Sequence, residues 1–302
     1  IECMERGAKI VVIAPEYGPP STKADYWIPI RPQTDAALWL GITRLMIEGK
    51  WYDEGFVRAF TDFPLLVRTD NLRRLRAHEV FPGYKTTLAA DGPSMKVQGL
   101  TAEQHAKLGD YVIWDEKAKA MRALTRDDVG ARMKAKGLSP ALEGTWKVKL
   151  VDGKEVEVAT LWTLYRTHLK DYDLDTVAEI TQAPKDLIRQ LAQDIGAMKP
   201  VAIHQGEGIN HWFHATEMNR AAYLPLMLTG NIGKPGAGCH TWAGNYKAAL
   251  FQGSKQTGPG FKGWVAEDPF QPNLDPNAPG RDVETHAYTK DEEPAYWNHG
   301  DL

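Results

Sequence analysis

The residues of this chain best placed to do chemistry lie in the stretch GEGINHWFH, residues 206–214. The apolar segment Pro200–His204 directly before it predicts a β-strand, and the glycines that follow let a backbone approach a ligand closely because they carry no Cβ. Asn210, His211 and His214 would then offer hydrogen-bond donors and acceptors at the carboxyl end of a strand. Open α/β sheets bind ligands at this end, so we expect a ligand here.

A second candidate is the turn Gln33-Thr34-Asp35, which lies between a predicted strand and a predicted helix. The ordinary interpretation is a helix N-cap, because Thr and Asp side chains accept hydrogen bonds from the first backbone N–H groups of a helix. The alternative is a nucleotide contact, in which the carboxylate of Asp35 accepts from N1–H and N2–H of guanine. One aspartate can serve both purposes, so the residues alone leave both interpretations open.

The same stretch argues against two common kinds of site. The GEG at residues 206–208 resembles the start of a GxGxxG dinucleotide fingerprint, but His211 occupies the third glycine position. His211 and His214 form an HxxH pair without the adjoining glutamate of a zinc protease. Cys3 and Cys239 are too far apart in the sequence for a cysteine cluster. We therefore predict no metal site made by this chain's own side chains.

Composition narrows the classes of partner. The 302 residues are 43% hydrophobic and 25% charged, as in an ordinary globular protein, and the net charge of −3 is nearly neutral. Nucleic acid and anionic membranes attract basic proteins, so neither is an expected partner. No apolar run reaches the roughly 18 residues that would suggest a membrane span.

The elements that must position these residues begin with a predicted domain over residues 1–49. Ile1–Gly7 reads as the last turn of a helix, so we expect an internal part of a longer polypeptide. Lys9–Ala14 predicts a strand buried on both faces of a parallel sheet, and Tyr26–Ile30 predicts a second strand. A helix over Ala36–Glu48 should follow. This order fits the second half of a dinucleotide-binding α/β domain.

Residues 50–158 read as an inserted mixed α/β region. A short helix is expected near Tyr52–Phe60, and the chain from Lys85 onward reads as largely loop-like. Asp152-Gly153 lies between two strand-like runs and is a strong hairpin signal.

Residues 159–252 read as a second α/β domain with a glycine-rich cofactor loop. The expected helices lie near Ala159–Lys170, Leu174–Ile180, Pro184–Ile195 and Ala215–Leu228, with the strand and the loop before the last of them and a second glycine-rich loop after it. Residues 253–302 are dense in Gly, Pro, Asn and Asp and read as an extended loop segment.

Several blocks together resemble the molybdopterin oxidoreductases of the dimethyl sulfoxide reductase family, over residues 1–252. The blocks are Ile13–Tyr17, Ala24–Trp27, Pro32–Leu38, Phe63–Arg68, the Asp152-Gly153 hairpin, Asn210-His211-Trp212 and Leu228–Gly233. Within the family, Asn210-His211-Trp212 and the stretch Phe63–Asp70 resemble the nitrate reductase-like branch, and Trp242–Lys247 most resembles the alpha subunits of nitrite oxidoreductases. The implied fold class is α/β, a fragment of a multidomain enzyme with Rossmann-like parallel-sheet units and an inserted mixed region.

The resemblance implies a cofactor, molybdenum bis(molybdopterin guanine dinucleotide), and assigns residues to it. The segments matching one guanosine-binding end are Ala14, Pro15, Glu16, Tyr17 and Gly18 together with Gln33, Thr34 and Asp35. The positions lining the pterin and the molybdenum cavity are Gly206, Glu207, Gly208 and His211, with Asn210 and His211 as catalytic residues. The molybdenum ligand and the ligands of a 4Fe-4S cluster would lie outside this chain.

The implied activity is the interconversion of nitrite and nitrate by oxygen-atom transfer, with nitrate, perchlorate and related reductases or dehydrogenases as alternatives. The implied partners are an iron-sulfur beta subunit, a haem or membrane-anchor gamma subunit and a small oxyanion substrate. The sequence itself gives no location; the resemblance implies a membrane-associated or periplasmic enzyme. A non-catalytic relative that keeps the fold as a scaffold is the rival from another class.

Overall fold

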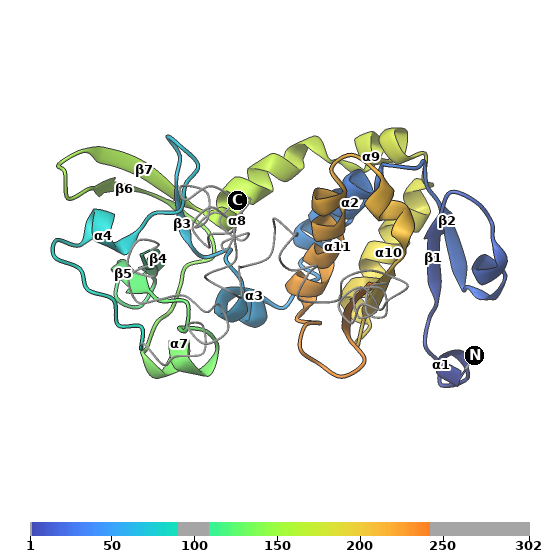
Figure 1. The fold of residues 1–302 in the computed structure, drawn as a ribbon, viewed down its shortest axis with the longest axis horizontal. Coiled ribbons are helices and arrows are strands. Elements are labelled where there is room, and N and C mark those ends of the chain that lie inside the picture. The colour runs from blue at the N-terminus through green and yellow to red at the C-terminus, as the bar shows by residue number, and fades with distance from the viewer. Residues whose placement is uncertain (1, 90–108, 242–302) are drawn as a thin grey trace, which may run out of the picture. The chain divides into compact units, whose positions relative to one another are not determined.

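The computed structural model describes residues 2–89 and 109–241, in two compact units (Figure 1). The first unit comprises Ile1–Pro64, Pro140–Thr145 and Ala159–Thr241, and the second comprises the described parts of Leu65–Ser139 and Trp146–Val158. The predicted loop segment 253–302 and the block Trp242–Lys247 lie outside the described residues. No helix within the described ranges is long and apolar enough to cross a membrane.

The first unit opens with the helix α1 (Glu2–Glu5) and two parallel strands, β1 (Val11–Ala14) and β2 (Tyr26–Pro29). Both strands were expected from the sequence, and the structure confirms them. The predicted full burial of the first strand is wrong, because every residue of β1 is only half-buried. The alternate side chains Val11 and Ile13 pack against the core, because they point to the same face of the strand.

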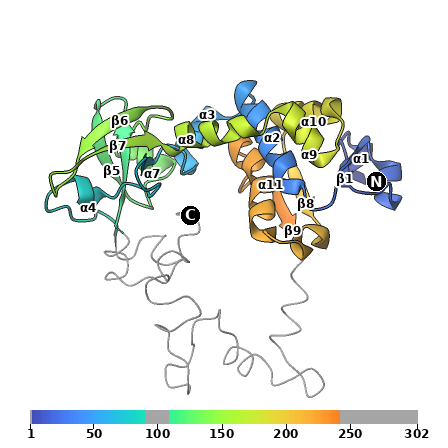
Figure 2. The ribbon, with the colours of Figure 1, turned by 90° about the horizontal axis from the view of Figure 1, so that it is seen from above.

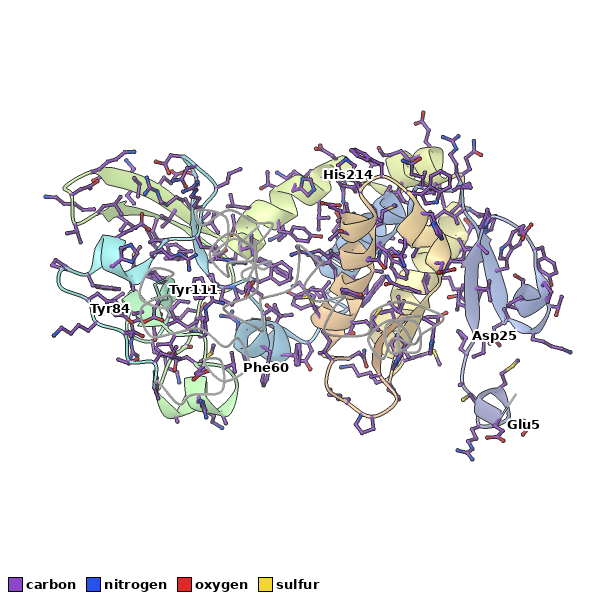
Figure 3. The ribbon with its side chains drawn as sticks, viewed as in Figure 1. Glu5, Asp25, Phe60, Tyr84, Tyr111 and His214 are labelled. Atoms are coloured by element: carbon purple, nitrogen blue, oxygen red, sulfur yellow. The ribbon has the colours of Figure 1, made fainter. Side chains whose placement is uncertain are left out.

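Side chains outside the strands fix this small sheet in place. Asp194 accepts hydrogen bonds from Lys9 Nζ at 2.8 Å and from the hydroxyl of Tyr26 at 2.9 Å. Asp25, labelled in Figure 3, accepts from the backbone N–H of Ile10 at 2.7 Å. Burial and the neighbouring Asp194 carboxylate raise the pKa of Tyr26, so its hydroxyl remains a donor at neutral pH.

The core of the first unit is built around the helix α2 (Asp35–Glu48). Leu38, Ile42 and Met46 recur every four residues, so they share one face of the helix, and none is exposed. This helix packs against α9 (Leu174–Thr181), α10 (Lys185–Ala197) and α11 (Ala215–Thr229), as Figures 1 and 2 show. The approach to α9 is close: a Cβ on Gly41 would lie 2.6 Å from Cγ2 of Val177.

The shorter helices of this unit confirm the remaining helix predictions to within a few residues. They are α3 (Glu54–Phe60), α8 (Leu161–His168) and the 3-10 turn η2 (Leu169–Asp171). Asp53 caps α3 by accepting from Phe56 N, and Thr160 caps α8 by accepting from Thr163 N.

A second parallel pair joins β8 (Ala202–Gln205) to β9 (Gly238–Thr241), with Ala202 opposite Gly238. β8 was predicted; β9 was not, because its residues read as the end of a glycine-rich loop. The apolar composition of Val201–His204 would suggest a buried strand, but Gln205 is the only buried residue of β8, and Ala202 and His204 are exposed.

The second unit is mainly β-structure. One sheet has the order β3 (Leu66–Arg68), β7 (Glu155–Thr160), β6 (Thr145–Lys149), and β4 (Tyr111–Asp115) pairs antiparallel with β5 (Ala120–Leu124). Two short helices, α4 (Ala77–Val80) and α7 (Ala131–Ala135), complete it.

The hairpin predicted at Asp152-Gly153 is confirmed, with Gly153 at a φ of 88°. The loop-like interpretation after Lys85 is wrong for residues 111–124, which form β4 and β5. None of the predicted site residues lies in this second unit. The division at 1–49, 50–158, 159–252 and 253–302 stays a prediction; contacts place both β1 and β8 in the first unit.

Candidate functional site

The first group of predicted site residues lies at the carboxyl edge of the β1–β2 pair. Because the strands are parallel, with Ala14 opposite Pro29, the chain leaves both strands at the same edge. The loop Pro15–Gly18 and the turn Gln33–Asp35 therefore both belong to this edge. Two segments that are separate in the sequence thus follow the carboxyl ends of two paired strands.

An aromatic pair is fixed at this edge. Trp27 Nε1 donates to the carbonyl of Ala14 at 3.0 Å, and the ring of Tyr17 meets that of Trp27 edge-on, with centroids 5.3 Å apart. Tyr17 is 60% exposed. The loop turns back at Gly18, whose N–H donates to the carbonyl of Glu16 at 3.0 Å. An exposed ring therefore stands where the first strand ends.

The turn into α2 presents a carboxylate. Gln33 has a positive φ of 72°, and Thr34 holds the N-cap position but donates its hydroxyl to Arg31 O at 2.6 Å instead of capping the helix. Asp35 is the first residue of α2 and is half-buried. Burial raises its pKa, and its carboxylate forms no ion pair with any residue of the described ranges.

One residue at this edge was missed by the sequence reasoning. Ser21 lies in the 3-10 turn η1 (Pro19–Lys23), directly after the Pro15–Gly18 loop, and is 3% exposed. Its Oγ has no hydrogen-bond partner within the described part of the chain. A serine in a proline-rich turn carries no sequence signal for burial, so only the structure reveals this unsatisfied group.

The second group lies in the 3-10 turn η3 (Glu207–His211), which follows the carboxyl end of β8. Glu207, Gly208, Asn210 and His211 are all exposed. A Cβ on Gly206 or Gly208 would meet no heavy atom within 4 Å, so both glycines face open space.

A network of amides supports this turn. Asn219 of α11 donates from Nδ2 to Asn210 Oδ1 at 2.8 Å and to the carbonyl of Ala215 at 2.7 Å. Gln205 donates from Nε2 to the carbonyl of Asn219 at 3.3 Å. Gln205 is 7% exposed, and its Oε1 has no partner among the described residues. The sequence reasoning missed both Gln205 and Asn219.

The two histidines of the HxxH pair have separate surroundings. His214, labelled in Figure 3, precedes α11 with a φ of 61°, and its Nδ1 lies 3.8 Å from Oε2 of Glu217. His211 lies in η3. In residues 2–89 and 109–241, no group of three or more His, Cys, Asp or Glu side chains is arranged to hold a metal ion.

The glycine-rich loop that follows α11 anchors the start of β8 through Asn231. Asn231 is fully buried, accepts from the backbone N–H of Val201 at 3.1 Å and donates to Thr229 Oγ1 at 2.7 Å. Gly230 ends α11 in the left-handed conformation, with a φ of 66°. The start of β8 is thereby tied to the end of α11.

The predicted residues thus form two groups on two separate sheets of the first unit. A cavity of about 240 Å³ elsewhere in this unit contains none of them. Its lining comes from the second half of α2 and from α8 and η2, including Arg44, Arg166 and Lys170.

Comparison with known proteins identifies relatives. The family model of the molybdopterin oxidoreductases matches residues 2–296. The perchlorate reductase subunit alpha of Dechloromonas aromatica is 31% identical over 83% of this chain and 27% of that protein. The respiratory nitrate reductase subunit alpha of Haloferax mediterranei is 30% identical over 84% of this chain and 25% of that protein.

Two further matches are more distant. The dimethylsulfide dehydrogenase subunit alpha of Rhodovulum sulfidophilum is 28% identical over 83% of this chain and 25% of that protein. The solved structure of acetylene hydratase from Pelobacter acetylenicus has a TM-score of 0.41 and 17% identity, over 78% of this chain and 19% of that chain. The chain spans about a quarter of the length of the curated relatives it matches.

Proposed function

The chain belongs to the molybdopterin oxidoreductases of the dimethyl sulfoxide reductase family, and we propose that it is part of a catalytic alpha subunit that transfers an oxygen atom to or from a small oxyanion. We name nitrite and nitrate as the substrate pair. The observation that carries the proposal is the position of Asn210 and His211, exposed in η3 directly after the parallel strand β8.

The polar groups of the first unit fit the proposed cofactor, molybdenum bis(molybdopterin guanine dinucleotide). At the β1–β2 edge, the half-buried Asp35 carboxylate can only accept hydrogen bonds when ionised, as the N1–H and N2–H of guanine require, and the unsatisfied Ser21 Oγ can donate or accept. At the β8 edge, Gln205 Oε1 is a buried acceptor that has no partner in residues 2–89 and 109–241. Gly206 and Gly208 leave open space beside the backbone.

Each group of residues has a distinct task in this proposal. Ala14–Gly18 and Gln33–Asp35 hold a guanosine end, while Gly206, Glu207, Gly208 and His211 line the pterin. When bound, the cofactor supplies the oxygen-atom transfer and the two-electron change. The chain's own side chains bind the oxyanion: the amide of Asn210 and the imidazole of His211 donate hydrogen bonds, and a protonated His211 adds positive charge.

The relatives bear on substrate and partners. Their names include a perchlorate reductase, a nitrate reductase and a dimethylsulfide dehydrogenase, so nitrate or perchlorate reduction is the second candidate activity. All three are named alpha subunits, which supports further subunits as partners. Our proposal names an iron-sulfur beta subunit and a haem or membrane-anchor gamma subunit. The 4Fe-4S cluster of the full-length subunit is part of the same proposal, with ligands outside this chain.

The test is His211→Ala in the full-length enzyme, with molybdenum content measured beside nitrite-dependent reduction of an artificial acceptor. We expect turnover to fall by more than molybdenum content. His168→Ala is the control, because His168 is also exposed in the first unit but lies on α8. Equal loss of metal and activity would make His211 a cofactor anchor only, and unchanged activity would remove it from the site.

Two further measurements separate the parts of the proposal. Turnover of perchlorate, with neither nitrite nor nitrate accepted, would leave the family unchanged and overturn the named substrate pair. Asp35→Ala should lower nucleotide-cofactor occupancy at limiting cofactor supply, because a charge-assisted hydrogen bond contributes about 1.5–3 kcal/mol. Normal occupancy in that variant would exclude Asp35 from the guanosine site.

A further inference from the structure

We infer that Asn219 is a positioning residue that fixes the side-chain amide of Asn210 as a hydrogen-bond donor. This inference rests on the proposed function, because it assigns the chemistry with which Asn210 meets its ligand. The site then selects ligands that carry acceptor oxygens, such as an oxyanion.

The orientation of Asn219 follows from its backbone partner. Its Nδ2 lies 2.7 Å from the carbonyl oxygen of Ala215, four residues earlier in the chain. A carbonyl oxygen can only accept, so the NH₂ group of Asn219, and not its Oδ1, must face it. Side-chain amides are often ambiguous between two flipped orientations. The Ala215 carbonyl removes that ambiguity here.

The orientation of Asn210 follows in turn. The NH₂ group of Asn219 has two hydrogens, and the one not used by Ala215 is donated to Asn210 at 2.8 Å. The atom of Asn210 that receives it must be an acceptor, which is Oδ1. The Nδ2 of Asn210 is left with both hydrogens, without a partner in the described part of the chain.

The orienting residue is itself held firmly. The backbone carbonyl of Asn219 accepts from Gln205 Nε2 at 3.3 Å, which ties α11 to the end of β8. Its neighbours Met218, Ala221 and Ala222 are buried in the first unit. Asn210, in contrast, is exposed in a 3-10 turn. A residue on a packed helix thus sets the direction of a residue on a short turn.

The direction of the amide has a chemical consequence. With Oδ1 turned toward Asn219, Asn210 offers two N–H groups to the oxygens of a bound anion. With the amide flipped, it would present an oxygen lone pair to the same anion, which repels it. Asn219→Asp removes the donor that holds Oδ1 of Asn210 and the donor to the Ala215 carbonyl. Because a carboxylate only accepts hydrogen bonds, it favours the flipped amide, with Nδ2 of Asn210 toward residue 219.

The experiment uses the full-length enzyme and measures KM and kcat for nitrite together with molybdenum content. Asn219→Asp should raise KM by about ten- to a hundredfold, as expected for losing a hydrogen bond to a charged group, with molybdenum content unchanged. Asn219→Leu, which frees the Asn210 amide to adopt either orientation, should raise KM by a smaller factor. Asn71→Asp is the control: it makes the same chemical change at an exposed turn and retains the Oδ1 acceptor for Arg73 N–H.

The added negative charge of Asn219→Asp could by itself weaken anion binding, so a double-mutant cycle isolates the amide. In an Asn210→Ala background, Asn219→Asp should change KM by less than threefold. An equal effect with and without Asn210 would overturn the inference. A normal KM in Asn219→Leu would also overturn the inference. If Asn219→Asp fails to load molybdenum, the KM of Asn219→Leu is the deciding measurement. If Asn210→Ala alone leaves KM unchanged, the proposed role of Asn210 falls, whatever Asn219 does.

Discussion

Asn231 provides a direct test of how the loop after α11 holds the candidate site. Its side chain is fully buried and bridges the N–H of Val201 to Thr229 Oγ1, so Asn231→Ala removes an acceptor and a donor together. Thr229 still donates to the carbonyl of Pro225 at 2.7 Å and loses little. The dominant cost is therefore the Val201 N–H, which is left without its partner at the start of β8.

The magnitude follows from these contacts. An unsatisfied buried donor costs about 1–3 kcal/mol, and loss of the second hydrogen bond adds roughly 1 kcal/mol. We expect the free energy of opening at β8 to fall by about 2–4 kcal/mol, which corresponds to about 30- to 850-fold faster amide exchange at Val201. Exchange in the hairpin of the second unit should not change, because Asn231 belongs to the first unit.

The assay is hydrogen–deuterium exchange followed by mass spectrometry, with peptides that cover residues 200–206 and 145–158. Asn71→Ala serves as the matched control, since Asn71 accepts from Arg73 N–H at 2.9 Å in an exposed turn. It should leave both peptides close to wild type. Exchange at 200–206 within threefold of wild type in Asn231→Ala would refute the view that this amide anchors β8.

Two further predictions concern α2. Gly41→Ala should lower the free energy of unfolding by about 1–3 kcal/mol, because the new methyl would overlap Val177. Gly55→Ala is the control and should raise it by up to about 1 kcal/mol, because the nearest neighbour of the new Cβ would be Asp53 Oδ1 at 3.5 Å. Urea denaturation that gives both changes the same sign would contradict this. Asp35→Asn tests the burial of the carboxylate, because burial raises the pKa of Asp35 in the folded state. The stability of wild type relative to the variant should be highest in acid and should fall as pH rises from about 3.9 through the raised pKa. A stability difference that does not change with pH would exclude the shift.

The parts of the fold that the sequence predicts correctly are those specified by nearby residues. The hairpin has its turn signal, Asp152-Gly153, between two strand-like runs, and α2 ends at the C-cap glycine Gly49. β9 has no such signal. Its partner β8 lies across the whole of α11, and its first residue is a glycine, so only the tertiary pairing identifies it as a strand.

In the candidate site, too, some features are specified by nearby residues and others depend on tertiary contacts. Residue types and spacing indicate Asp35, Asn210 and His211, and the structure places them at the carboxyl ends of parallel strand pairs. The buried and unsatisfied oxygens of Ser21 and Gln205 depend on what packs over them, which no local pattern encodes. The role of Asn219 depends on a helix that folds back beside η3.

The first unit is discontinuous in sequence, and this has a consequence for synthesis on the ribosome. The chain that forms the second unit emerges after α2 but before α10 and α11, so the strands β3 to β7 can pair while the first unit is still incomplete. Meanwhile the apolar face of α2, with Leu38, Ile42 and Met46, has no helices to cover it. On the nascent chain, this apolar face therefore stays without its partner helices until residues 174–229 have emerged from the ribosome.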